Sequence, residues 1–164
     1  MQIESLEGHH HLVPLLSAWH YSEWGHLYPH DVWNAELAAA EFETMASSTS
    51  ADRTWIAFEG ATRTTQDVLG SVSLMASDDL AGYEHLTPWL ASMFVAPTAR
   101  GRGVASALVD HLLAAAGEAG HDVVYLFTAG QAAFWSARGW QIIADVDTAG
   151  TPMVVMSCPT LRAL

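Results

Sequence analysis

Apolar positions along the chain repeat with two different spacings. Apolar residues three or four positions apart predict a helix from Leu12 to about Trp24 and another from Val32 to about Met45, for which Asp31 is a suitable N-terminal cap. Short apolar runs between polar turns predict strands. These runs are Gln2–Leu6, Thr54–Phe58, Val68–Met75, Trp89–Val95, Val123–Phe127, Gln141–Val146 and Met153–Ser157.

Two more helices lie between the later strands. One begins at Val104 and ends near Gly120, and a short one runs from Gln131 to Arg138 before Gly139. Helices placed between strands predict one α/β or α+β domain over residues 1–164, with helices on both faces of its sheet. The polar turn between the strands ending at Phe58 and starting at Val68 predicts a hairpin.

Composition agrees with one compact domain. Hydrophobic residues make up 51% and charged residues 15% of 164 residues, which is enough to bury a core. There is neither an apolar run of about 20 residues nor a leader pattern in residues 1–11, so we expect a soluble, cytoplasmic protein that does not bind membranes. Cys158 is the single cysteine, which excludes an intrachain disulfide and predicts a small buried side chain in the last strand.

The net charge of −12, from 18 acidic and 6 basic residues, bears on partners. It repels a phosphate backbone, so nucleic acid is not an expected partner. It favours a cationic small molecule or a basic peptide, although acidic surfaces also serve solubility alone. The nine histidines do not indicate a metal site, because the contiguous His9–His11 cannot face one ion from a regular element and Pro29 interrupts the spacing of His26 and His30.

The segment Val95–Val109 joins a strand end to a helix through a turn rich in arginine and glycine. Gly101 and Gly103 allow close approach to a ligand, and the helix that follows offers unpaired amides to an anion such as a pyrophosphate. An ordinary strand-to-helix turn is the alternative. Val104 and Ala105 replace the Lys and Ser/Thr of an ATP-binding loop, and Ser106 replaces the third glycine of a dinucleotide fingerprint.

Arg100, Gly103 and Ala105 form the pattern R-x-x-G-x-A after Met93–Pro97, and this resembles the acetyl-CoA motif of the GCN5-related N-acetyltransferases (GNAT). The segment Thr128–Trp140 resembles the aromatic element that follows the fifth strand in that family. The resemblance implies a mixed, mostly antiparallel sheet of about seven strands. It also implies acetyl transfer from acetyl-CoA, as co-substrate, to a primary amine of a small molecule or peptide, by direct attack on the thioester. A homodimer is compatible with such folds.

The resemblance further implies which residues contact acetyl-CoA. Residues of the strand before the turn pair with the pantetheine arm, amides of the turn hold the pyrophosphate, and two later residues complete the site. The set is Met93, Phe94, Val95, Arg100, Gly101, Arg102, Gly103, Val104, Ala105, Thr128 and Phe134.

Two departures from the family pattern concern catalysis. Trp135 stands where the family has a tyrosine that acts as general acid, and an indole N–H cannot give up its proton in that way. Ala91 and Ser92 stand where some relatives carry a glutamate base. The remaining candidates for a base are Glu23 and Asp79, followed by His26, Asp31, Asp78, Glu84 and His85. An alternative is therefore a non-catalytic acyl-CoA-binding or regulatory module of the same fold, and a further one is acetylation of a protein amino terminus.

Overall fold

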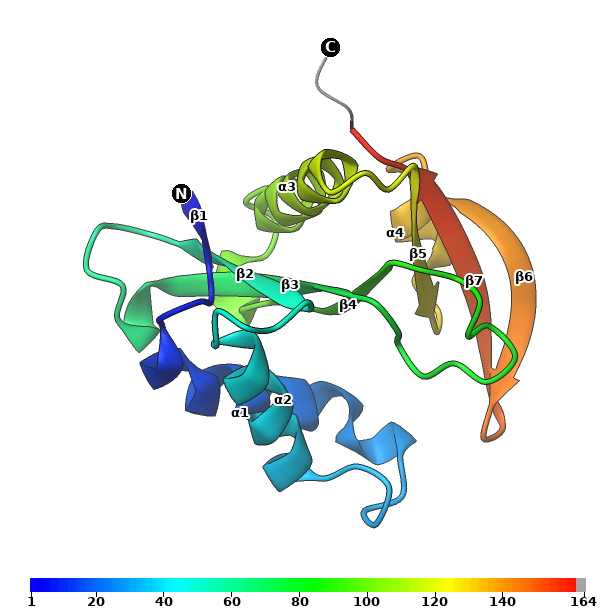
Figure 1. Ribbon diagram of the computed structural model, residues 1–164, viewed down its shortest axis with the longest axis horizontal. Coiled ribbons are helices and arrows are strands. Elements are labelled where there is room, and N and C mark those ends of the chain that lie inside the picture. The colour runs from blue at the N-terminus through cyan, green and yellow to red at the C-terminus, as the bar shows by residue number, and fades with distance from the viewer. Residues whose placement is uncertain (162–164) are drawn as a thin grey trace. The chain divides into compact units, whose positions relative to one another are not determined.

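The computed structural model describes residues 1–161, in which seven strands form one sheet with the order β1-β2-β3-β4-β5-β7-β6 (Figure 1). The strands are β1 (Gln2–Ser5), β2 (Arg53–Phe58), β3 (Val68–Met75), β4 (Trp89–Val95), β5 (Val123–Thr128), β6 (Gln141–Thr148) and β7 (Thr151–Pro159). The α-helices are α1 (Val13–Trp24), α2 (Ala35–Met45), α3 (Val104–Glu118) and α4 (Ala132–Ser136). Short 3-10 turns are η1 (His10–Leu12), η2 (Gly25–Leu27), η3 (Thr65–Asp67) and η4 (Pro97–Ala99). These elements confirm the predicted fold class, a mixed and mostly antiparallel sheet with helices.

The second helix begins later than its sequence pattern predicts. Asp31 is not its cap, because residues 30–33 form a turn in which the amides of Val32 and Trp33 donate to the carbonyl of Pro29. Asn34 caps α2 instead: its Oδ1 accepts hydrogen bonds from the amides of residues 36 and 37 at 3.0 and 3.1 Å. Asparagine and aspartate are equally good N-terminal caps, so the sequence pattern does not distinguish Asn34 from Asp31. The turn that follows Pro29 is what places Asn34 at the helix start.

The chain divides into two compact units, and the first comprises residues 1–74 and 92–112. In β2, the side chains of Ile56 and Phe58 join a core with α1 and α2, whereas Trp55 points to the other face and contacts His111 of α3 with ring centroids 5.4 Å apart. Helices therefore cover both faces of this part of the sheet (Figure 1), as the sequence predicted. The strands β2 and β3 pair antiparallel and form the predicted hairpin.

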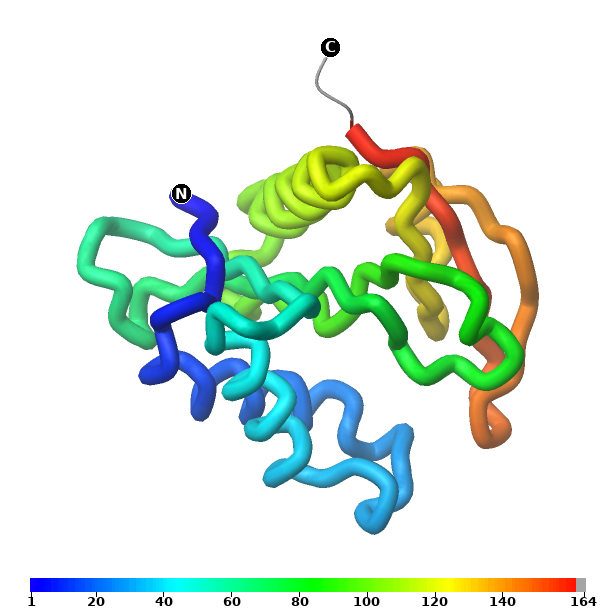
Figure 2. Tube along the Cα trace, in the orientation of Figure 1, coloured from blue at the N-terminus to red at the C-terminus, as the bar shows by residue number. Residues whose placement is uncertain are grey.

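The second unit comprises residues 75–91 and those from 113 onward. Here β7 pairs antiparallel with both β5 and β6, and β6 is the edge strand. The acidic loop of residues 76–88 runs over this part of the sheet (Figure 2), where Leu80 packs with Trp89 and Val155 and is only 8% exposed. Cys158 lies buried in β7 as predicted, and burial raises the pKa of its thiol.

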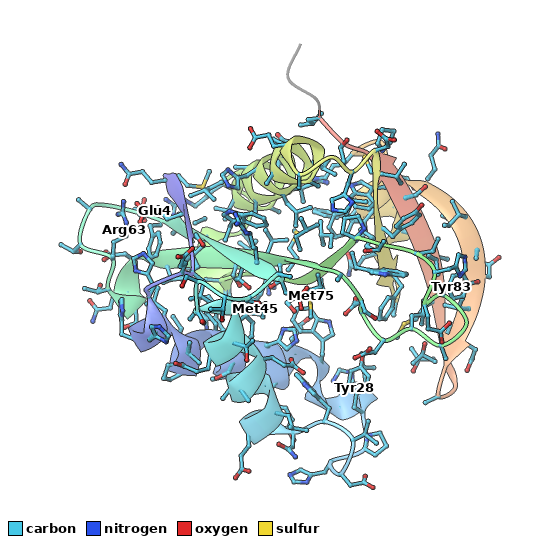
Figure 3. All side chains as sticks on the ribbon, viewed as in Figure 1. Glu4, Tyr28, Met45, Arg63, Met75 and Tyr83 are labelled. Atoms are coloured by element: carbon cyan, nitrogen blue, oxygen red, sulfur yellow. The ribbon has the colours of Figure 1, made fainter. Side chains whose placement is uncertain are left out.

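An ionic cluster ties the β2–β3 connection of the first unit to its first strand. The guanidinium of Arg63 donates to the carboxylate of Glu4, which lies beside it (Figure 3). It also donates to the amide oxygen of Gln2. The same guanidinium lies 4.9 Å from the ring centroid of Phe58. Within residues 1–161 no helix is long and apolar enough to cross a bilayer, and no three metal-ligating side chains gather.

Candidate active site

The turn between β4 and α3 is anchored at both ends and exposed in its middle. Ala99 and Val104 are 1% and 2% exposed, whereas residues 100–103 between them are all exposed. Gly101 and Gly103 have φ angles of +73° and +79°, and a Cβ built on either would meet nothing within 4 Å. The first amides of a helix have no partner inside it, so this turn presents N–H groups to solvent beside an open surface. Such a surface suits an anion.

Two arginines flank these glycines in different ways. The Nε of Arg100 donates to the carbonyl of Val95 at 3.2 Å, and its guanidinium lies 6.0 Å from the ring centroid of Phe94. Arg102 instead forms an ion pair with Glu59, in which both side chains are about half exposed. Exposed pairs of this kind are weak, so a phosphate group at the turn could draw Arg102 away from Glu59.

The strand that leads into the turn is held by close packing. The ring of Phe94 lies 4.9 Å from that of Trp19 of α1, and Met93, Phe94 and Val95 are all half-buried. Sequence reasoning missed Gly70 of β3, where a Cβ would lie 2.5 Å from the carbonyl oxygen of Phe94. A glycine inside an apolar strand run is the signal that could have indicated such a close approach.

The aromatic element of the second unit is a packed cluster. Trp135 of α4 is 7% exposed, and its ring meets Phe134 and Trp140 edge to face at 5.1 and 5.4 Å. Arg138 stacks over Phe134 at 3.7 Å and donates to its carbonyl at 3.0 Å. In the second unit, Trp135 is therefore a packing side chain, which agrees with its inability to act as an acid.

Thr128, the last residue of β5, lies on the wall of a surface pocket of about 180 Å³ in the second unit. The other lining residues come from the turn before α4, from the first residue of α4 and from the β6–β7 hairpin. They are Gly130, Ala132, Asp145, Val146, Pro152, Met153 and Val154. Thr128 thus stands beside an open space whose walls are mainly apolar.

The candidate bases lie on the surface. Glu23 on α1 and Asp79 in the loop before β4 are exposed, as are the other candidates except Asp78, which is half-buried. The carboxylate of Glu84 accepts hydrogen bonds from the backbone amides of Glu84 itself and of Gly82. These bonds lower the pKa of the carboxyl group, which makes Glu84 a weaker base. His85 stacks on Tyr83 with ring centroids 6.3 Å apart. Of these candidate bases, Glu23, His26 and Asp31 belong to the first unit, and the four candidates between residues 78 and 85 belong to the second.

His20 of α1 is a functional candidate that sequence reasoning missed. Its ring contacts those of Trp24, Trp33 and Phe42 at 4.6, 5.2 and 5.5 Å. Burial lowers its pKa from 6.5 to about 4, so the imidazole is neutral at pH 7. Its Nε2 lies 3.5 Å from the hydroxyl of Ser92 in β4. The signal was its place four residues after Leu16, on the apolar face of the predicted helix.

A family profile covers most of the chain. It is that of the acetyltransferase (GNAT) family, and it matches residues 12–140. No curated protein sequence matches the chain.

Three similar solved structures cover nearly all of this chain and of their own. An aminoglycoside 6'-N-acetyltransferase complexed with coenzyme A is 16% identical with a TM-score of 0.73, covering 100% of this chain and 99% of its own. A GCN5-related N-acetyltransferase from Kribbella flavida is 22% identical with a TM-score of 0.69, covering 96% of each chain. The spermidine N-acetyltransferase from Vibrio cholerae, in complex with CoA and spermine, is 13% identical with a TM-score of 0.67, covering 97% and 95%. At these identities the likeness shows the fold.

Proposed function

The chain belongs to the acetyltransferase (GNAT) family, and from this premise we propose that it transfers the acetyl group of acetyl-CoA to a primary amine. The observation that carries the proposal is the exposed turn of residues 100–103, with its open space at two left-handed glycines before the first turn of α3. That surface would bind the diphosphate of CoA through backbone amides. The guanidinium of Arg100 would add charge beside it.

The remaining contacts follow from the position of this turn. With the diphosphate at Arg100–Ala105, the pantetheine arm would pair with the backbone of Met93–Val95, whose half-buried apolar side chains agree with such a role. Thr128 and Phe134 complete the proposed set of residues that contact CoA. Thr128 is supported by the pocket that it lines.

The acceptor is proposed to be cationic before it reacts. The net charge of −12 attracts protonated amines, and two similar structures are named for aminoglycoside and spermidine substrates. A small polyamine or amino sugar is therefore the first choice, and a peptide amino terminus is the second. Since most alkylamines are protonated at pH 7, the acceptor must lose a proton before its lone pair attacks the thioester carbonyl. Glu23 and Asp79 remain the proposed bases from the sequence, and both are exposed enough to pass a proton to solvent.

The departing CoA thiolate would leave without an acid at position 135, because Trp135 is packed between aromatic rings. General acid catalysis is worth about 10²–10⁴-fold, and a free thiol titrates near pH 8.5, so its loss slows the transfer without preventing it. This packing also supports the second candidate function, a non-catalytic acyl-CoA-binding module. We further propose that residues 1–164 form one cytoplasmic domain that assembles as a homodimer. Of these residues, 162–164 lie outside the described part of the chain.

The test mixes the protein with acetyl-CoA and four amines, namely spermidine, spermine, kanamycin and a peptide with a free amino terminus, and follows CoA release. Thermal unfolding with and without CoA is recorded in parallel. We expect CoA to raise the melting temperature and at least one amine to release CoA. A raised melting temperature without release from any amine would favour the binding module. If CoA leaves the melting temperature unchanged, the proposal is wrong.

A further inference from the structure

Ser92 has an unusual backbone conformation within β4. Its φ is +53°, in the left-handed region that L-residues other than glycine seldom adopt, and it lies inside the strand (Trp89–Val95) rather than in a turn. Such a residue bends a strand and redirects its side chain. Strained backbone of this kind gathers at functional sites, which makes the direction of the Ser92 hydroxyl informative.

The hydroxyl of Ser92 faces the imidazole of His20, with its oxygen 3.5 Å from Nε2. The second ring nitrogen, Nδ1, is buried and has no hydrogen-bond partner in residues 1–161. A neutral imidazole carries one N–H, and a buried N–H without an acceptor costs more than a buried lone pair without a donor. The proton therefore belongs on Nε2, which donates to the Ser92 oxygen.

This tautomer decides what Ser92 can do. Because its oxygen accepts from His20, the hydrogen of the hydroxyl must point elsewhere, and Ser92 becomes a donor toward any ligand beside β4. The ring of His20 is kept neutral and in place by Trp24, Trp33 and Phe42, none of which carries a charge. The imidazole thus fixes the hydroxyl without itself changing charge near pH 7.

In the proposed complex, the direction of the pantetheine arm brings the thioester of acetyl-CoA close to the Ser92 hydroxyl. This step rests on the proposed function: with the diphosphate at Arg100–Ala105, the arm runs back along β4 from Val95 to Met93. The next residue in that direction is Ser92, where the thioester end would arrive.

We propose that the Ser92 hydroxyl, held by His20, donates a hydrogen bond to the thioester carbonyl oxygen as it gains negative charge. Ser92 is then a catalytic residue, and His20 is a positioning residue that acts through it. When the amine nitrogen forms its bond to the carbonyl carbon, the π electron pair moves to this oxygen. That pair returns as the carbon–sulfur bond breaks, with the sulfur leaving as CoA thiolate and the amine proton passing to solvent. A fixed donor aimed at that oxygen stabilises the transition state more than the ground state.

The first test uses two substitutions that spare the fold. Ser92→Gly removes the hydroxyl and suits the left-handed backbone, and His20→Phe keeps the aromatic packing but removes both nitrogens. With the amine that the wild type acetylates fastest, Ser92→Gly should lower kcat by about 10²-fold and leave the KM for acetyl-CoA unchanged. His20→Phe should lower kcat by about tenfold, and the double variant should be no slower than Ser92→Gly alone.

Two control variants match these changes. Ala149→Gly removes a left-handed non-glycine residue, with φ of +51°, and His111→Phe replaces another half-buried histidine that touches a tryptophan. Both should keep wild-type kcat. Wild-type kcat in Ser92→Gly, additive losses in the double variant, or a change confined to the acceptor KM in His20→Phe would each overturn the inference while leaving acetyl transfer intact. A wild type that releases no CoA from any of the four amines would overturn the proposed function as well.

A second readout needs no turnover. Nitrogen NMR of the histidine side chains, with His20→Phe used to assign the signal, should show the Nε2–H tautomer of His20 at pH 7. The signal should change in Ser92→Gly because the hydrogen bond is lost. An Nδ1–H tautomer would overturn the assignment of Ser92 as donor.

Discussion

The two segments that carry the family resemblance are built in opposite ways. The turn of residues 100–103 exposes its backbone and leaves open space beside Gly101 and Gly103. The aromatic element, by contrast, buries Trp135 and Trp140 to 7% and 2% exposure. Exposed backbone amides are available to a ligand, whereas buried aromatic rings contribute packing energy to the fold. The comparison predicts that substitutions in the first alter CoA binding and substitutions in the second alter stability.

The largest expected effect is on stability, from Trp135→Ala. Removing a buried indole that packs against two other aromatic rings should lower the free energy of unfolding by about 3–5 kcal/mol. Denaturant unfolding measures this change. Trp135→Tyr is the control for catalysis, because it restores the family's residue in the same cluster. Acetyl transfer faster by about 10²-fold in that variant would break the comparison, since the position would then be catalytic.

A smaller effect on stability is expected on acidification, and it comes from the buried His20 of α1 in the first unit. The folded protein holds the pKa of His20 at about 4, against 6.5 for the free group, because burial disfavours the charged ring. Between those two pH values the unfolded chain takes up a proton that the folded chain does not, so stability is full above pH 6.5 and falls on acidification, by about 3 kcal/mol at pH 4. Urea unfolding of the wild type and His20→Phe across this window isolates the effect. If the two proteins lose the same stability between pH 6.5 and pH 4, the burial of His20 is not the cause.

Gly70→Ala tests whether packing also shapes the strand before the exposed turn. The new Cβ would meet the Phe94 carbonyl at 2.5 Å, so the backbone must shift, at a cost of about 1–3 kcal/mol. Chemical denaturation gives the loss, and CoA titration shows whether the turn moves with the strand. A neutral substitution would mean that β3 and β4 can separate without cost.

Gly103→Ala tests whether the exposed turn binds CoA, and Gly150→Ala is its control elsewhere in the chain. Both glycines are left-handed with nothing near a new Cβ, so the two variants should lose similar stability, about 1–2 kcal/mol. Only Gly103→Ala should weaken CoA binding, by tenfold or more, the equivalent of about 1.4 kcal/mol. Calorimetric titration with CoA measures the affinity of each variant. Equal CoA affinities in the two variants would contradict the assignment of this turn as the diphosphate site.

The smallest effect is expected for Glu59→Gln. Because the ion pair of Arg102 with Glu59 is half exposed, its loss should change stability by less than about 1 kcal/mol. Releasing the guanidinium should tighten CoA binding by a few-fold at low salt, and the gain should fade as salt is added. Unchanged affinity at low salt would mean that Arg102 has no part in holding the diphosphate.

Local patterns predicted most of the elements. The bounds of β3 and β4 agree with the predicted strands, and α1 and β1 differ from their predicted ranges by one residue each. The misplaced start of α2 shows the limit of such patterns. Asp31 and Asn34 are equally good caps in isolation, and only the turn at Pro29 selects Asn34.

The sequence by itself determined the class of fold and the exposed glycine turn, because hydrophobic spacing and left-handed glycines act over a few neighbouring residues. Only the tertiary structure decided which side chains meet across the fold, such as His20 with Ser92 or Gly70 with Phe94. These pairs lie 72 and 24 residues apart in the chain. Their contacts depend on strand pairing and helix docking, and a local pattern carries no record of either.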